Sequence, residues 1–374
     1  MESRGASRTP THLVVPAFAV LAFLACWPAP AAAQMLGRLP AGMSPDSVDF
    51  TPSELYVLER GTISVFSLPG MTLTRSFGGS GRGPGRLSPS HSFDQAIRVV
   101  GETILAEDND KIILFSRTGR LIAEKRKPQN TTWFVPIGDR FVAKSMIVAG
   151  TPPSQIIRLV IYDSGLREVK ELYRQPWFQQ REGNGFSTEL LGDLLHFAVV
   201  GNRICVEQSP RGFAIELFDF SGSRVSTIER ARAGVPVTAA DREGEMALVR
   251  KEKRVAAMIG MTGSWEKLRQ IWTITFPSIT PALRELQASG GRLLVRTFER
   301  QDTTGKYVLL DLDGTAEREL WLPLPTDAET EARVSGTAFF KLVGDRFYYL
   351  RQDGASNRWE VHMAIVPDAG GKGR

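Results

Sequence analysis

Two short stretches of the sequence have residue types that could bind a ligand. The glycines at 78, 79, 81, 83 and 85 could cradle a phosphate, but the stretch lacks the Gly-Lys-Ser/Thr ending and the following helix that phosphate loops use. The acidic run from Glu107 to Asp110 could bind calcium, yet its spacing departs from an EF-hand loop. We therefore predict a connecting loop and a polar turn, in which Asp108 and Asn109 accept hydrogen bonds from backbone amides.

Nucleophilic and metal chemistry find little support in the residue types. No Gly-x-Ser-x-Gly elbow is present, and Cys205 lies in an apolar run where a free cysteine packs as a small hydrophobe. Beyond the first 33 residues the histidines are His91, His196 and His362, which lack the His-x-His or His-x-x-x-His spacing of zinc sites. The sequence therefore predicts no catalytic residue, no metal ion and no cofactor.

The elements that would position any site are short strands. Between residues 77 and 119 a glycine-rich loop leads into three apolar runs, each closed by turn residues, which is the pattern of an antiparallel meander. The residues that fit a known repeat are Phe77, Gly78, Gly83, Pro84, Gly85, Leu87, Pro89, Asp108, Asn109, Ile112, Phe115 and Gly119. With these residues the stretch resembles the NHL-type repeat of six-bladed β-propeller proteins from bacterial envelopes. The resemblance implies that it is one blade of a propeller.

Two sequence markers recur along the chain at blade-like intervals. One is an apolar strand that ends in a turn, as in FSLPG, FSRTG, IYDSG, FDFSG and LDLDG. The other is a hairpin turn before a strand, as in VVGETIL, PIGDRFV, VVGNRIC, ASGGRLL and LVGDRFY. Together they predict an all-β fold over residues 34–370, a six-bladed β-propeller of four-stranded antiparallel blades. Seven blades or an incomplete ring are the alternatives.

The longest interval between markers runs from Gly222 to Gly314. Within it, Thr238 and Asp241 can form a capping box before a run rich in Ala, Glu, Arg, Lys and Met that lacks strand alternation. We predict a helical insertion over about residues 231–276, between blades 4 and 5, instead of a seventh blade. The last blade shows only three strands, so we expect the segment 35–40 to pair with it and close the ring.

The first 33 residues have the plan of a secretory signal. Two arginines precede an apolar run from Leu13 to Trp27, and alanines at 31 to 33 offer a cleavage site. We predict a signal peptide over residues 1–33, a periplasmic or secreted mature protein, and no transmembrane span. A lipoprotein anchored at Cys26 is less favoured, because Phe23 stands where the lipidation motif prefers leucine.

Composition limits the class of partner. The formal net charge is +5, with 46 Lys and Arg residues against 41 Asp and Glu residues, which is too mild for a nucleic-acid footprint. Beyond the signal Cys205 is the only cysteine, so an intrachain disulfide is not expected. We predict a monomer whose stability comes from packing.

The two faces of the predicted propeller differ in loop length. The hairpin turns stay short, so the excess chain falls on the opposite face, in the connections between blades and the turns from second to third strands. Long loops on a rigid scaffold often carry binding residues, and arginine and aromatic side chains are common interface anchors. Packing between sheets and a solvated basic surface are the structural alternatives for such residues. The candidate binding residues on this face are Arg82, Arg86, His91, Trp177, Arg181, Trp265 and Arg300.

The predicted function is binding of a protein, peptide or glycan partner through this face, without covalent chemistry. One alternative is a metal-dependent hydrolase, such as a lactonase, or a lyase that acts at the central channel, because six-bladed propellers include such enzymes. Those enzymes line the channel with several carboxylates and asparagines. The expected inner strands of this chain offer only Asp49 and Glu285 as acids, so enzymatic activity is the less favoured interpretation. A structural envelope component is the other alternative.

Overall fold

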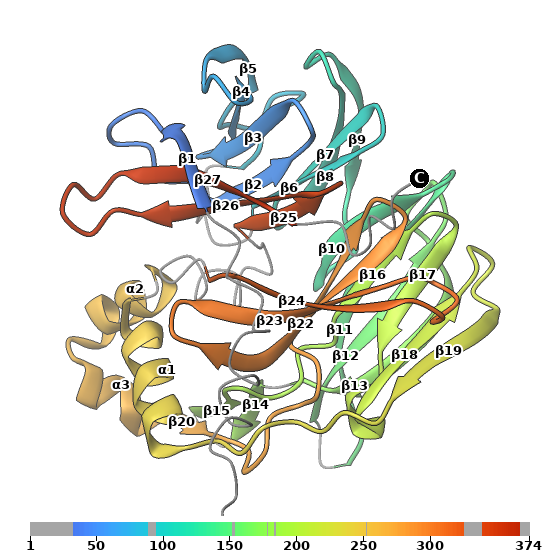
Figure 1. The fold of residues 1–374 in the computed structure, drawn as a ribbon, viewed down its shortest axis with the longest axis vertical. Helices are drawn as coiled ribbons and strands as arrows, with labels where there is room; N and C mark the ends of the chain where they lie inside the picture. The colour runs from blue at the N-terminus through green and yellow to red at the C-terminus, as the bar shows by residue number, and fades with distance from the viewer. Residues whose placement is uncertain are drawn as a thin grey trace, which may run out of the picture. The chain divides into compact units, whose positions relative to one another are not determined.

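The computed structural model describes residues 33–88, 95–151, 154–177, 179–182, 185–251, 253–324 and 339–366. Residues Ala31–Arg374 form one compact unit. Its strands form six four-stranded antiparallel sheets and one three-stranded sheet (Figure 1). The six larger sheets are the blades of a six-bladed β-propeller, which confirms the predicted fold class.

In each of the first five blades, four consecutive strands pair in chain order. At five of the six junctions the first strands of neighbouring blades contact one another, so the first strands are the innermost. Blades 1 to 3 consist of β2 (Ser47–Phe50), β3 (Glu54–Glu59), β4 (Thr62–Ser67) and β5 (Leu73–Gly78); β6 (Ala96–Val100), β7 (Thr103–Glu107), β8 (Lys111–Ser116) and β9 (Leu121–Arg126); and β10 (Thr131–Ile137), β11 (Arg140–Ala149), β12 (Ser154–Tyr162) and β13 (Glu168–Pro176).

The last blade is closed by the N-terminal strand. Strand β1 pairs antiparallel with β27, from Ala33 opposite Ala364 to Arg38 opposite Glu360, which confirms the expected closure of the ring. The observed strand begins and ends two residues earlier than the predicted segment 35–40. Blades 4 to 6 consist of β16 (Phe197–Val200), β17 (Arg203–Glu207), β18 (Phe213–Phe218) and β19 (Arg224–Arg230); β21 (Glu285–Ser289), β22 (Arg292–Gln301), β23 (Thr304–Leu310) and β24 (Glu317–Pro323); and β25 (Phe340–Val343), β26 (Arg346–Gln352), β27 (Trp359–Ile365) and β1 (Ala33–Arg38).

Apolar residues are buried between the blades, not within them. Six hydrophobic clusters each combine side chains from two consecutive blades, and the cluster of blades 6 and 1 completes the ring. At that last junction the rings of Phe50 and Tyr348 stack at 5.3 Å. Second and third strands are buried on both faces and therefore read as apolar runs, whereas outer strands such as β5 and β9 are largely exposed.

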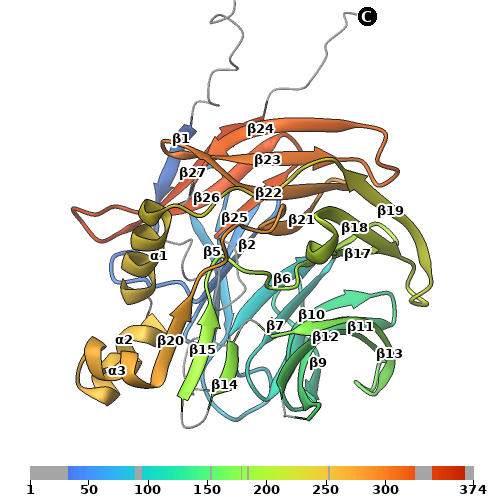
Figure 2. The same ribbon diagram turned by 90° about the horizontal axis from the view of Figure 1, so that it is seen from below.

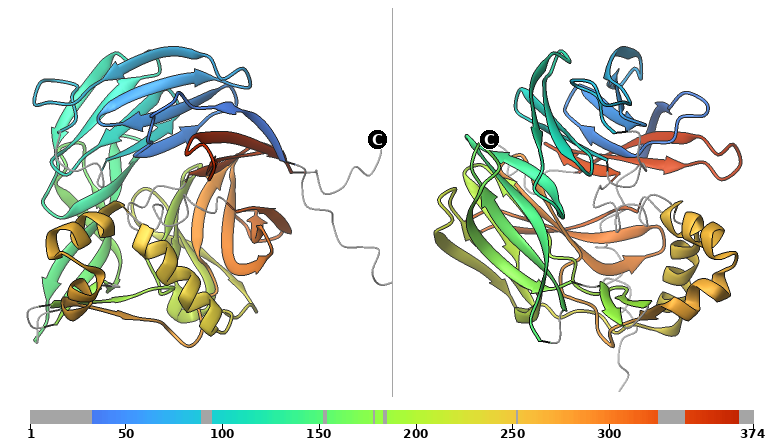
Figure 3. Two further views of the ribbon diagram at one scale, coloured as in Figure 1. Left: turned by 90° about the vertical axis from the view of Figure 1, so that its left-hand side faces the viewer. Right: turned by 180° about the vertical axis from the view of Figure 1, so that it is seen from behind.

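The predicted insertion between blades 4 and 5 contains three helices, α1 (Ala239–Lys251), α2 (Lys253–Thr262) and α3 (Trp265–Ile271). Its capping box forms as expected, since Asp241 N donates to Thr238 Oγ1 at 3.2 Å and Thr238 N donates to Asp241 Oδ2 at 2.9 Å. The helices pack against one another in sequence order, and the right view of Figure 3 shows them as one group. In the part of the chain that the structure describes, no helix is long and apolar enough to cross a membrane.

The insertion also contributes to a three-stranded sheet that the sequence did not predict. After α3 the chain continues as β20 (Trp272–Thr275), which pairs in parallel with β15 (Gly185–Glu189) from the connection between blades 3 and 4 (Figure 2). Strand β14 (Gln179–Glu182) completes this sheet. A separate small core, with Val249, Val255, Leu268 and Trp272 buried, holds the helices and this sheet together.

Candidate functional site

Chain length is concentrated on one face of the propeller. The turns from first to second strand contain two residues in blades 2 to 6 and three in blade 1. On the opposite face, connections between blades occupy residues 79–95, 177–196 and 231–284, whereas turns from second to third strands have at most six residues. We call this opposite face the loop-rich face. The excess chain therefore lies in the interblade connections.

The glycine-rich connection between blades 1 and 2 carries the first predicted residues. Arg82 and Arg86 are both exposed. Arg86 Nη1 donates to Ser80 O at 3.3 Å, so its guanidinium lies on the loop's own backbone. Gly81 has a φ of +142°, and a Cβ there would lie 3.3 Å from Arg86 Cδ, which explains the glycine at this position. His91 lies outside the described residues.

Trp177 and Arg181 lie in the connection between blades 3 and 4. Trp177 is partly buried against the hydrophobic cluster that these two blades share, and its backbone N donates to Gln155 O at 2.8 Å. Arg181 lies in β14, opposite Phe186 of β15. The structure thus places Trp177 in packing between sheets and Arg181 in the small three-stranded sheet.

Trp265 and Arg300 stabilise the insertion. The Trp265 ring packs edge-on against Trp272 at 6.1 Å, and the Arg250 guanidinium lies 4.9 Å from its centre. Arg300 extends from β22 towards the insertion, where its Nη2 lies 3.6 Å from Glu245 Oε1. The predicted binding residues that the structure describes therefore belong to separate connections and elements of the fold.

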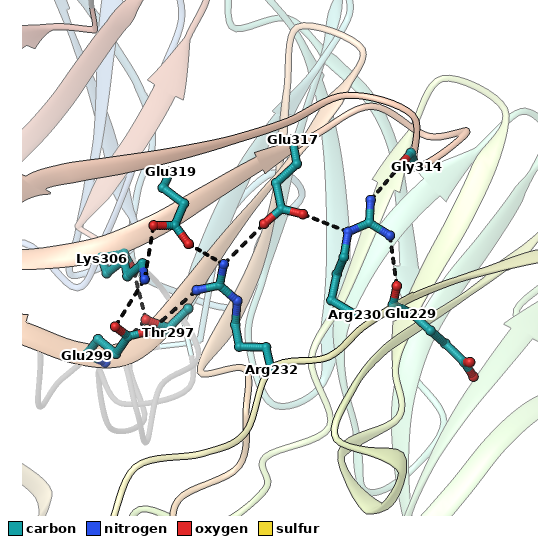
Figure 4. Close-up of polar contacts among 9 residues, drawn as sticks. All are labelled: Glu229, Arg230, Arg232, Thr297, Glu299, Lys306, Gly314, Glu317 and Glu319. Atoms are coloured by element: carbon teal, nitrogen blue, oxygen red, sulfur yellow. Dashed lines mark hydrogen bonds and ion pairs between the residues drawn. The ribbon is translucent and has the colours of Figure 1, made fainter.

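The root of the insertion is held by a network of ion pairs (Figure 4). Arg232, just after β19, lies 3.4 Å from Glu299 Oε1 and 3.1 Å from Glu317 Oε1, and it also pairs with Glu319. Lys306 Nζ lies 3.1 Å from both Glu299 and Glu319. Burial alone would raise the pKa of Glu319, but hydrogen bonds from Arg232 and Lys306 lower it. Because Arg232 and Lys306 share carboxylates, the ion pairs form one network that connects the start of the insertion to blade 5.

A different polar site, not predicted from the sequence, lies where Glu107 of a second strand contacts the inner strand of the next blade. Glu107 ends β7 with 1 % of its surface exposed, and its carboxylate accepts from Trp133 N at 2.7 Å and Phe134 N at 2.8 Å of the next blade. A repeated spacing could have revealed this position, because it always lies six residues after the hairpin glycine. In blades 2 to 6 it holds Glu107, Lys144, Glu207, Arg296 and Leu350.

Trp133 has a strained backbone at this site. Its φ is +64°, in the left-handed region that bulky side chains rarely adopt, and it lies in a β-bulge between Thr132 and Val135. The guanidinium carbon of Arg98 lies 4.6 Å from the centre of its ring, and Lys144 Nζ lies 4.9 Å from it. We call Arg98, Trp133 and Lys144 the Trp133 site. No local sequence pattern predicts that this tryptophan adopts a positive φ.

Lys144 is the most unusual titratable group of the Trp133 site. It is 9 % exposed, and burial lowers the pKa of its ammonium to about 8. Glu207, Asp193 and Glu285 oppose this shift and Arg98 adds to it. Within the described residues no carboxylate lies within ion-pair distance of Lys144, and its Nζ donates to Leu194 O at 3.3 Å. A buried cation with incomplete compensation is a candidate functional group.

The strain at Trp133 can be tested with paired substitutions. Both Trp133→Gly and Trp133→Ala remove the ring, but only alanine keeps the cost of a left-handed backbone. We therefore expect the glycine variant to be more stable by about 1 kcal/mol in urea denaturation. At the neighbouring Thr132, where φ is not positive, glycine should be the less stable of the two. An alanine variant at 133 as stable as the glycine variant would contradict strain at this residue.

The acids of the inner strands are engaged by neighbours. Asp49 Oδ1 accepts from Lys341 Nζ at 2.5 Å, and Oδ2 accepts from Val99 N at 2.6 Å. Glu285 Oε1 accepts from Gln287 Nε2 at 2.8 Å. No group of three or more His, Cys, Asp and Glu side chains placed to hold a metal ion occurs among the residues that the structure describes. These contacts favour a structural role for Asp49 over that of a metal ligand.

Comparison with known proteins adds likenesses of fold only. No family model matches the chain, and no curated protein matches it. Among solved structures, the Pan2 WD40 domain of Neurospora crassa is 10% identical, with a TM-score of 0.40, over 90% of this chain and 96% of that one. BamB from Moraxella catarrhalis is 9% identical, with a TM-score of 0.29, over 86% and 70%. Apo AztD from Citrobacter koseri is 10% identical, with a TM-score of 0.37, over 82% and 68%. The fold assignment rests on the strand pairing described above.

Proposed function

We propose that the protein is an exported binding scaffold that engages a protein, peptide or glycan partner through its loop-rich face, without covalent chemistry. The observation that carries this proposal is the asymmetry of the faces. One face has turns of two to six residues between the strands of a blade, whereas the other bears an insertion with its own hydrophobic core. The residues of this insertion are not needed to close the ring of blades. Loops on a rigid scaffold are where binding residues concentrate.

Export is part of the same proposal. The predicted cleavage site follows Ala33, and the strand that closes the ring begins there. Cleavage would leave the pairs from Gln34 and Met363 to Arg38 and Glu360 in place. The signal plan and the folded unit are therefore compatible, and the mature N-terminus can be read by mass spectrometry.

The face that binds the partner can be located by photo-crosslinking in the cells that produce the protein. A benzoylphenylalanine at Arg82, exposed in the glycine-rich connection, should crosslink to a partner. The same probe at Arg346, next to a hairpin turn of the opposite face, should not. Replacing Arg82 and Arg86 together by alanine should reduce the yield of crosslinks from a probe elsewhere on the loop-rich face.

The matched control is alanine at both Arg140 and Arg346 on the opposite face. Both double variants change only surface arginines, so each should alter the free energy of unfolding by no more than about 0.5 kcal/mol. Circular dichroism and melting curves check this. Crosslinks from position 346 alone, with loss of capture in the Arg140 and Arg346 variant, would assign binding to the opposite face and refute the proposal.

A further inference from the structure

We propose that the Trp133 site binds an oxyanion, a carboxylate or a phosphate group carried by the partner. The inference rests on the proposed function, because Trp133 and Lys144 lie near the start of the inner strand β10, which begins on the loop-rich face. It adds the chemistry that the partner must present. Both cations contact the Trp133 ring, and the charge of Arg98 helps to lower the pKa of Lys144, so the two positive charges lie near each other and can act on one anionic group.

The spare hydrogen-bonding capacity at the site is of the donor type. Arg98 uses Nη1 for Glu107 Oε2 at 3.1 Å and Phe134 O at 3.4 Å, which leaves the N–H groups of Nε and Nη2. Lys144 has three N–H donors and gives one bond, to Leu194 O. A guanidinium edge beside an ammonium is a common arrangement for recognising carboxylate or phosphate.

The carboxylates near these cations are already used as acceptors. Glu107 accepts from two backbone amides of the next blade. Asp193 Oδ1 accepts from Leu195 N at 2.8 Å, and Glu207 Oε2 accepts from His196 N at 3.3 Å. Glu285 is engaged by Gln287. The nearby acids therefore accept bonds from backbone amides or, in Glu285, from a side-chain amide, and a ligand anion would complete the compensation of Lys144.

The backbone conformation holds the Trp133 ring in place without a ligand. The bulge and the positive φ of Trp133 orient its ring, and the bonds from the Trp133 and Phe134 amides to Glu107 fix that conformation. Strained residues persist where the surroundings over-determine them, and they concentrate at ligand-binding sites. The same carboxylate accepts from Arg98, so it positions both the ring and one cation.

Titration calorimetry of the purified full-length mature protein tests this inference. The probes are inorganic phosphate and acetate, with acetamide as the uncharged match to acetate. We expect phosphate or acetate to bind and acetamide not to bind. Lys144→Met should weaken anion binding roughly tenfold or more, since it removes a charge-assisted donor. The affinity of the unmodified protein should fall as pH rises through about 8, where Lys144 loses its proton, and the variant should lack this step.

The variant is expected to fold, because removal of a buried ammonium relieves a desolvation cost. Melting curves verify this. Absence of anion binding by the unmodified protein, or equal affinity of the Lys144→Met variant, would overturn the inference. Preference for phosphate or for acetate distinguishes a phosphorylated partner from one with an acidic side chain. Because small anions need no partner, failure here leaves the crosslinking result untouched, and the reverse also holds.

Discussion

We expect Glu107→Ala to lower the free energy of unfolding by about 3 to 5 kcal/mol, as when one partner of a buried ion pair is removed. The Glu107 carboxylate is buried and accepts from Trp133 N, Phe134 N and Thr132 Oγ1, and from Arg98 Nη1. Its loss would leave a largely buried guanidinium and two backbone amides without their acceptor. Denaturation in urea, with the slope compared between variants, measures this cost.

Glu59→Ala in blade 1 is the matched control. Glu59 also ends a second strand on the loop-rich face, but it is half-buried, and its carboxylate accepts from one backbone amide, Ser44 N, at 2.7 Å. We expect this variant to lose about 1 kcal/mol. Equal losses at the two positions would show that the bonds between blades 2 and 3 add nothing to the stability of the ring.

The effect of Glu107 should depend on pH with a defined sign. Burial alone would raise the pKa of Glu107, but Arg98, Lys127 and the backbone amides of Trp133 and Phe134 together lower it below its ordinary value of 4.5. The carboxylate therefore stabilises the fold fully above pH 4.5, and this contribution is lost as pH falls through the lower pKa of the folded state. The stability difference between the unmodified protein and Glu107→Ala should accordingly shrink in acid.

The blades were predictable because their signals are local. In blades 2 to 6 the inner hairpin has a glycine at its turn, such as Gly101 with a φ of +56°, followed by a short apolar strand. The second and third strands of a blade are mostly buried, so their sequences are short apolar runs. The same turn-and-strand markers therefore recur at equivalent positions in successive blades. Closure by β1 followed from counting, since the last blade lacked an outer strand. The capping box at Thr238 located the first helix of the insertion.

The small three-stranded sheet was missed because its pairing is not local. Phe186 of β15 lies opposite Trp272 of β20, with a whole blade and three helices between them in the chain. Each strand is short and belongs to a long connection, so neither carries a repeat marker. Gly185 shows how close the approach is, since a Cβ there would lie 2.4 Å from Ile271 O. Such a contact is visible only in three dimensions.

Residue type alone was a weak guide to the site. Trp265 and Arg300 have the types of interface anchors, yet in the structure they contact Trp272 and Glu245 and hold the insertion. Trp133 was passed over because its surroundings in the sequence resemble an ordinary inner strand. Its significance comes from a backbone angle and from the two cations that contact its ring. Exposure and three-dimensional contacts, which the sequence does not encode locally, are needed to tell whether such a residue packs or is free to bind.

A chain that begins at Leu39 is expected to melt about 5 °C or more below one that begins at Ala33, and to aggregate on heating. The shorter chain lacks β1, which pairs with β27 and whose Leu36 packs against the cluster of blades 6 and 1. Its loss would expose the backbone edge of β27, a template for pairing with other chains. Differential scanning calorimetry and light scattering during the same ramp report both effects.

Arg38→Ala in the longer chain separates strand pairing from charge pairing. Arg38 Nη2 lies 2.8 Å from Glu360 Oε1, but its side chain is 42% exposed, so removing this ion pair should cost at most about 1 kcal/mol. Backbone pairing and the burial of Leu36 remain in that variant, so its melting temperature should stay close to that of the unmodified chain. If the chain starting at Leu39 melts like Arg38→Ala and stays soluble, β1 is dispensable and the ring is held by its interblade clusters alone. A large loss confined to the shorter chain would instead place the stabilisation in the sixth blade's outer strand, because that strand is the one element of the ring supplied from the opposite end of the sequence.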